Sequence, residues 1–223
     1  VKVKASKLVI DCHHVLGDMD KALEEAKQAT AAVAGSGDAE AVAAAHGLVV
    51  RAFLATGSAD EALEAAAAAT RAPAKAAQAK GWLLLAEAHA YKAQLADDAS
   101  SSEACAAAAQ AQQTARGLFR EAGQPKDEAE ALRGAIGSLL EGREFAQALA
   151  LAKELEAFPA EGETGAMAAI GAQLVAASHL RSFHGTGTFL DGGAEAMLAA
   201  AKRAVAAFDD LGDVLRRGAA QQT

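Results

Sequence analysis

The sequence is poor in aromatic residues and in proline, with 4% aromatic residues and three prolines among 223 residues. Hydrophobic residues make up 52% of the chain, but alanine supplies much of that share. A core of alanine and leucine requires backbones that approach closely, which suits packed helices and suits β-sheets poorly. The composition therefore predicts an all-α protein with a core large enough for one or two domains.

Cysteine is also scarce, and no apolar run is long. Cys12 and Cys105 are far apart and follow no C-x-x-C spacing, so we expect two buried structural thiols in a reducing compartment. No run reaches the roughly 18 apolar residues that a membrane span needs, and the opening residues VKVKASK lack a signal-peptide core. These absences predict a soluble, intracellular protein without direct membrane insertion, in the cytosol or inside an organelle.

Basic residues are outnumbered, with 21 Lys and Arg against 29 Asp and Glu and a formal net charge of −8. Nucleic acids and anionic membranes bind clustered cations, so the charge balance argues against both as partners. The chain begins at Val1 rather than Met, and its end, LGDVLRRGAAQQT, resembles the start of a further helix over 213–223. We therefore expect a processed product or a piece of a longer protein, and a removed transit peptide is compatible with this start.

What the sequence does have is internal repetition. Three segments place an Ala-Leu pair after a short polar turn: GDMDKALEEAKQAT, GSADEALEAAAAAT and REFAQALALAKELEAF. Other apolar-periodic runs alternate with them, including KLVIDCHHVL and KGWLLLAEAHAY, which have the spacing of helices with one buried stripe. The pattern predicts an α-solenoid of about five antiparallel helix pairs in a single repeat domain, with units at 1–35, 36–72, 73–123, 124–159 and 160–212.

The prolines and the large apolar residues are consistent with this division. Pro73, Pro125 and Pro159 all fall where a second helix is expected to end and the next first helix to begin, positions at which proline is tolerated. The few large apolar residues are expected to fill gaps between the alanine-rich pairs. Trp82 is predicted to be buried between neighbouring helices, and Phe53, Phe119 and Phe158 are assigned similar roles.

These motifs resemble the tetratricopeptide-repeat (TPR) family. Trp82, Leu85, Ala86 and His89 are similar to its W-x2-L-G-x2-Y motif, with Ala in place of Gly and His in place of Tyr. The units are longer than the common 34 residues and look like the subclass of about 40 residues. The resemblance implies a TPR-like superhelix whose first helices line a concave, partner-binding face.

Two segments are expected to form enlarged turns between the helices of a pair. One is the glycine-rich stretch SFHGTGTFLDGGAEA, with its connector placed at 183–193, and the other is AQLADDASSSE in the third unit. A phosphate loop would need a Gly-Lys-Ser/Thr ending and a preceding strand, and neither is present. The glycine-rich stretch is interpreted as a connector, with Phe183, His184, Phe189 and Leu190 as candidate partner contacts.

Residues that invite a chemical function have a simpler interpretation in a helical array. Cys12, His13 and His14 are adjacent, so their side chains point about 100° apart and cannot chelate one ion without a second helix. His13 and His89 fall at the same first-helix position, as mid-sized core residues would. No G-x-S-x-G element or Ser/Cys–His–carboxylate arrangement is apparent. The sequence predicts neither an enzyme, nor a metal site, nor a cofactor.

The predicted function is a non-catalytic scaffold, or a structural subunit of a larger complex, that binds a partner protein. Helical spacing gives eight groove candidates: Lys7, Asp11, His14, Arg51, Lys80, Glu87, Glu130 and Arg133. Some members of the family that this chain resembles bind the carboxylate of a chaperone tail with paired asparagines and lysines in the groove. The chain contains no asparagine, which argues against such a carboxylate clamp. The alternatives are the regulatory or sensor region of a longer multidomain protein, and a helical enzyme or small-ligand sensor.

Overall fold

The computed structural model describes residues 2–159, 166–210 and 212. Within these ranges the chain forms ten α-helices and no strand, and it divides into two compact units at residues 124 and 125. The all-α prediction is confirmed. The predicted start of a helix at 213–223 lies outside the described residues.

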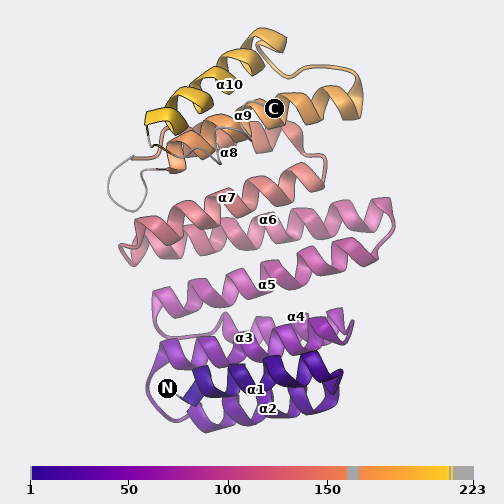
Figure 1. Ribbon diagram of the computed structural model, residues 1–223, viewed down its shortest axis with the longest axis vertical. Helices are drawn as coiled ribbons and strands as arrows, with labels where there is room; N and C mark the ends of the chain where they lie inside the picture. The colour runs from indigo at the N-terminus through magenta and orange to yellow at the C-terminus, as the bar shows by residue number, and fades with distance from the viewer. Residues whose placement is uncertain (1, 160–165, 211, 213–223) are drawn as a thin grey trace. The chain divides into compact units, whose positions relative to one another are not determined.

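The first unit contains three consecutive helix pairs (Figure 1). In each pair the second helix runs back along the first, and successive first helices also contact one another, as α3 and α5 do. The six helices are α1 (Lys2–Leu16), α2 (Met19–Val33), α3 (Ala39–Ala55), α4 (Ala59–Ala69), α5 (Lys75–Leu95) and α6 (Asp98–Glu121).

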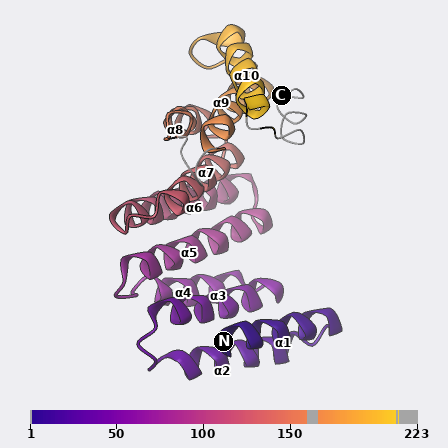
Figure 2. The same cartoon turned by 60° about the vertical axis from the view of Figure 1, so that its left-hand side comes forward.

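The second unit contains two further pairs, and its core is built in the same way from alanines and a few large side chains. Its first pair contacts its second through α8 and α9. In Figure 2 they are labelled α7 to α10, and the colour of the ribbon grades over them from pink to yellow. They are α7 (Pro125–Glu141), α8 (Phe145–Glu156), α9 (Met167–Thr186) and α10 (Gly193–Asp210).

Helix boundaries follow the expected local signals. Pro73 precedes α5, Pro125 is the first residue of α7, and Pro159 follows the end of α8, so all three prolines lie between pairs as predicted. Gly17 and Gly57 adopt positive φ angles in the turns inside the first two pairs, a conformation that glycine accepts without a Cβ clash.

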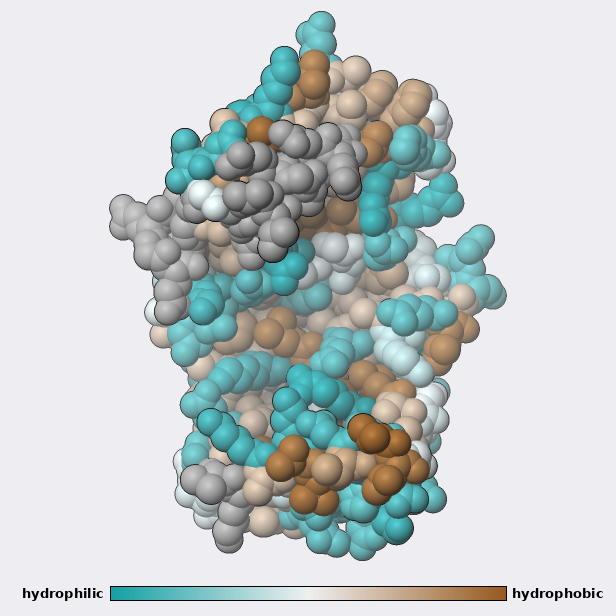
Figure 3. Space-filling view, in the orientation of Figure 1, coloured by the Kyte–Doolittle hydropathy of each residue, from teal (hydrophilic) through white to brown (hydrophobic). Residues whose placement is uncertain are grey.

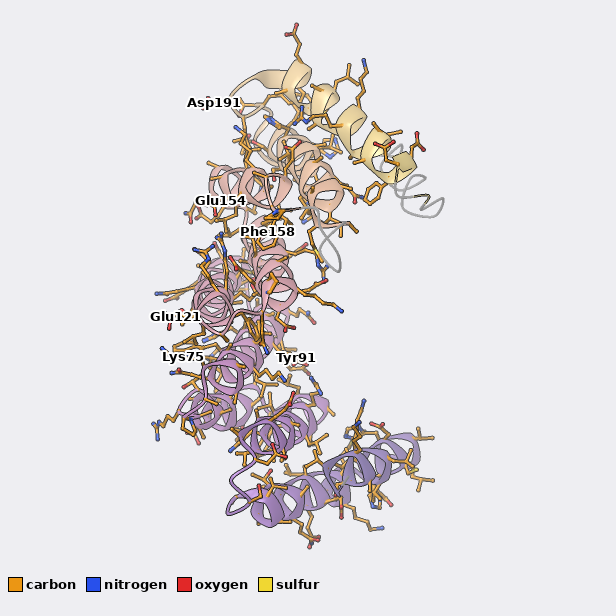
Figure 4. All side chains as sticks on the ribbon, turned by 90° about the vertical axis from the view of Figure 1, so that its left-hand side faces the viewer. Lys75, Tyr91, Glu121, Glu154, Phe158 and Asp191 are labelled. Carbon is orange, nitrogen blue, oxygen red and sulfur yellow. The ribbon has the colours of Figure 1, made fainter. Side chains whose placement is uncertain are left out.

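The third pair corrects one prediction. AQLADDASSSE is not an enlarged turn, because α5 ends at Leu95 and α6 begins at Asp98. The Asp97 side chain accepts a hydrogen bond from the backbone N–H of Ser100 at 3.0 Å, and this N-cap starts the helix early. Lys75 and Glu121 close the far end of the same pair with a 2.6 Å ion pair, on one side of the unit in Figure 4. The extra residues lengthen the two helices.

Two buried glycines set how closely neighbouring pairs approach. A Cβ built on Gly81 of α5 would lie 2.7 Å from the backbone nitrogen of Thr70 at the end of α4, and closer still to the carbonyl of Ala69. A Cβ on Gly171 of α9 would lie 2.5 Å from the Cα of Glu156 at the end of α8. Each of these two first helices therefore rests directly on the backbone of the preceding second helix.

Burial differs from the prediction at several residues. Trp82 is only partly buried and packs against small residues of α5 and α6, whereas Phe119 and Phe208 are almost completely enclosed. Cys105 is buried as expected, but Cys12 is exposed. His13 and His89 are partly buried and are not core residues. Residue type and sequence spacing predict which face of a helix is buried. How deeply one residue is buried depends on the size of the side chains around it.

The most buried histidine is His179 on α9, which is 1% exposed and whose ring nitrogens have no hydrogen-bond partner in the described part of the chain. Burial lowers its pKa below the usual 6.5, Lys153 lowers it further and Asp191 partly opposes them. Burial also lowers the pKa of His46 and His89. These histidines favour the neutral form in the folded state.

We therefore expect stability to fall as the pH falls below about 6.5, because the unfolded chain binds protons there that the folded chain resists. His179→Leu should reduce this dependence, since leucine has no proton to accept and no unpaired nitrogen to bury. Urea unfolding at pH 7.5 and pH 5 measures the effect. An unchanged difference between the two pH values in the variant would contradict the assignment to His179.

Candidate functional site

A hollow in the first unit lies across its first helices. It has a volume of about 530 Å³, and α1, α3 and α5 all contribute to its lining. We call this hollow the groove. Its lining residues are Val3, Lys4, Lys7, Glu40, Ala43, Ala44, Gly47, Leu48, Arg51, Lys80, Leu83, Leu84 and Glu87.

Small residues on the middle helix make the groove hollow. Ala43, Ala44 and Gly47 of α3 lie between the larger side chains of α1 and α5. A Cβ on Gly47 would lie 3.4 Å from a Leu84 methyl group, so the absent side chain leaves room for Leu84 to approach. The floor is apolar, and charged groups lie around it, as in protein sites that bury an apolar anchor within a polar rim.

Two ion pairs cross the groove between successive repeats. Lys80 Nζ lies 2.5 Å from Glu40 Oε1, and Arg51 Nε lies 3.5 Å from Glu87 Oε1. Each pair joins α3 to α5, and all four side chains are more than a third exposed. Exposed pairs of this kind contribute only about 0–1 kcal/mol to stability. Their main structural effect is to help fix how α5 lies against α3.

The remaining two cations of the groove are different. Lys4 and Lys7 of α1 are exposed and make no ion pair with any residue that the structure describes. With two pairs internally balanced, these lysines leave the groove a net positive charge in a chain whose formal net charge is −8. The groove thus combines an apolar floor with two cations that are free to meet an acidic group.

The sequence-predicted groove residues are brought together only in part. Lys7, Arg51, Lys80 and Glu87 line the groove, although all but Lys7 are already paired within the chain. Sequence reasoning missed Lys4, Glu40 and the small residues of α3. The spacing of Ala43, Ala44 and Gly47 along one helix face was the available signal for the floor.

The other four candidates lie outside the groove. Asp11 lines a separate shallow hollow on α1 together with Cys12, and His14 is partly buried with its Nε2 unpaired among the described residues. Glu130 and Arg133 belong to the second unit and form an ion pair with each other on α7, at 2.7 Å. The local i,i+3 pairing accounts for these two residues without a ligand.

The glycine-rich connector is shorter than predicted, because α9 continues to Thr186 and α10 begins at Gly193. Ser182 and Gly185 are therefore helical. The Ser182 hydroxyl donates to the Thr188 carbonyl at 3.1 Å, and the Arg143 guanidinium donates to the Gly185 carbonyl at 3.0 Å. Both contacts use backbone carbonyls of this segment as acceptors.

Aromatic residues mark the surface at this connector. The rings of Phe183 and Phe189 stack with centroids 4.5 Å apart, and Phe183 is 41% exposed. His184 is exposed and its ring lies 6.2 Å from that of Phe183, while Leu190 is half-buried. The four residues predicted as partner contacts thus lie close together in the second unit, whereas the groove residues belong to the first.

The described ranges contain no group of three or more His, Cys, Asp or Glu residues placed to hold a metal ion. Ser100, Ser101 and Ser102 lie inside α6 rather than in a turn. No helix among the described residues is both long and apolar enough to cross a membrane.

Comparisons with known proteins place the fold. No family model and no curated protein matches the chain. A crystal structure from Podosopora anserina, of a protein described as a kinesin light chain with nearly identical TPR-like repeats, is 12% identical. Its TM-score is 0.62, and the match covers 95% of this chain and 97% of that one. A second crystal structure, of a single-substitution variant of that protein, gives a TM-score of 0.61 at 12% identity, over 94% and 96% of the two chains. The chain therefore has a TPR-like repeat fold, as the sequence pattern predicted.

Proposed function

We propose that this protein is a non-catalytic scaffold that binds a segment of a partner protein in the groove formed by α1, α3 and α5. TPR-like repeat folds typically serve protein–protein interaction. The observation that carries the proposal is the groove itself, an apolar hollow of about 530 Å³ with two lysines at its edge that make no ion pair in the described ranges. Acidic and apolar side chains on one short segment would match both features.

The proposal assigns different roles to the groove residues. Leu83, Leu84 and Leu48 offer apolar surface to an inserted side chain, and the alanines of α3 provide the space that it fills. Lys4 and Lys7 would attract a carboxylate and increase the rate of encounter more than they increase affinity. Lys80 and Arg51 keep α5 in place against α3 through their ion pairs.

We expect Ala44→Leu to abolish capture of the partner without unfolding the protein. Ala44 is exposed in the groove on α3, so a leucine would occupy the hollow while remaining on a helix surface that accepts it. The measurement is capture from the native source with the protein as bait, followed by mass spectrometry and by titration with the recovered partner.

The matched control is Ala68→Leu, which adds the same side chain at an exposed position of α4. This variant should retain the partner that Ala44→Leu loses, with at least a tenfold difference in Kd between the two variants. If both variants capture the same proteins as the unmodified chain, the groove is not the binding site.

A further inference from the structure

The first helix of the described chain has apolar side chains on two sides. Ile10 faces α2 and α3 and is 3% exposed. On the outer side, Leu8, Val15 and Leu16 are 66%, 87% and 72% exposed, and Cys12 is exposed between them. We call these four residues the outer stripe. Figure 3 shows hydrophobic surface gathered over α1 in the lower part of the view.

This stripe is unusual for an exposed helix. Seven large hydrophobic residues are exposed in the described part of the chain, and four of them, Leu8, Val9, Val15 and Leu16, lie on α1. Contiguous exposed apolar surface on a helix normally marks a face that another surface covers. The stripe also borders a hollow of about 380 Å³. Another surface is therefore expected to cover it.

The charges beside the outer stripe indicate what kind of surface covers it. Helical spacing of 100° per residue places Lys4, Lys7 and Asp11 along one edge of the stripe, with the lysines in the N-terminal half and the aspartate one turn further on. The first turn of α1 contains no acidic residue, although the positive end of a helix favours negative charge. An antiparallel helix would bring its negative C-terminal end beside these lysines.

We propose that the outer stripe binds the outer stripe of a second copy of this protein, with the two α1 helices antiparallel across a two-fold axis. Residue 9 is the midpoint of Lys2–Leu16, so full overlap of the two helices places it at the axis. Lys7 of each copy then faces Asp11 of the other, and Leu8 packs against Leu8 near the axis. The edge is self-complementary in charge, as a two-fold interface requires.

The size of the interface sets its strength. One helix face per copy buries less than the roughly 800 Å² per partner that is typical of stable complexes. The dimer is therefore weak, with a Kd on the order of 10–100 µM rather than in the nanomolar range. Sedimentation of the purified protein from about 5 to 500 µM should show a reversible change from monomer to dimer.

The first test concerns the apolar part of the interface. Leu8→Glu should weaken dimerisation at least tenfold, because it buries two unpaired carboxylates near the axis. Leu198→Glu is the matched control, since Leu198 is an exposed leucine on α10, and this variant should dimerise like the unmodified protein. A protein that remains monomeric at 500 µM, or a Leu8→Glu variant that dimerises normally, overturns the proposal.

The second test concerns the antiparallel geometry. Lys7→Glu and Asp11→Lys should each dimerise several-fold more weakly than the unmodified chain at low salt, because each places like charges opposite one another. An equimolar mixture of the two variants should dimerise as well as the unmodified chain, since both contacts become attractive in the mixed dimer. Failure of the mixture to recover would overturn the antiparallel pairing. These measurements use purified protein without a partner, so they are independent of whether the groove binds one.

Discussion

Gly81→Ala is expected to destabilise the first unit by about 1–2 kcal/mol net, although alanine is the better helix former. The added Cβ would meet the backbone of Ala69 and Thr70, which cannot move aside as a flexible side chain could. Overpacking of this kind costs about 1–3 kcal/mol or more, and here it must exceed the gain of about 1 kcal/mol from replacing glycine inside a helix. Denaturant unfolding, followed through the fluorescence of the adjacent Trp82, measures the loss.

Gly117→Ala is the matched control. Gly117 lies inside α6. Apart from its chain neighbours and the adjacent backbone of α6, no atom lies within 4 Å of the position that an added Cβ would take. The same substitution there should stabilise the protein by about 0.5–1 kcal/mol, because only the conformational term remains. Opposite signs for the two variants are the expected result. Equal effects would show that α5 does not rest on the end of α4 as described.

Phe208→Ala is expected to cost about 3–5 kcal/mol in the second unit, because it removes a fully enclosed ring. Phe208 is 0% exposed and packs with Ala169, Ala172 and Ala204, residues too small to collapse into the space that it would leave. Far-UV circular dichroism during guanidinium unfolding is a suitable measurement, since the loss should appear in the midpoint of the helical signal.

Phe183→Ala provides the comparison within the same unit. Phe183 is 41% exposed and its main contact is the stacked ring of Phe189. Its truncation should cost no more than about 1–1.5 kcal/mol, the range of an aromatic pair at a surface. Similar losses for the two phenylalanines would contradict the burial that separates them. Trp82, predicted to be a buried anchor, is only partly buried, so its truncation is expected to cost less than that of Phe208.

Only part of the candidate groove could be predicted from the sequence pattern. Helical spacing named Lys7, Arg51, Lys80 and Glu87 as groove candidates, and these four line the hollow across α1, α3 and α5; their role in binding stays a prediction. The spacing could not show that Arg51 pairs with Glu87 and Lys80 with Glu40. Those contacts join residues about 40 positions apart, and they depend on the rotation and offset of one helix against the next.

The sequence by itself determined the helical class, the alternation of first and second helices and the positions of the breaks between them. These features depend on local physics: alanine favours helix, apolar periodicity marks a buried face, and Pro73, Pro125 and Pro159 cannot lie inside a helix. The early start of α6 is accompanied by the Asp97 cap, and the continuation of α9 to Thr186 by a long-range hydrogen bond from Arg143 to the Gly185 carbonyl.

Only the tertiary structure decided which small residues permit close approach and which large ones are enclosed. Gly81, Gly117 and Gly171 all lie inside α-helices, and helix propensity alone treats the three positions alike. The distinction arises from the backbone of the preceding second helix, which meets Gly81 and Gly171 and not Gly117. Burial of Phe208 and exposure of the α1 outer stripe have the same origin, since the accessibility of a side chain is set by what packs against it.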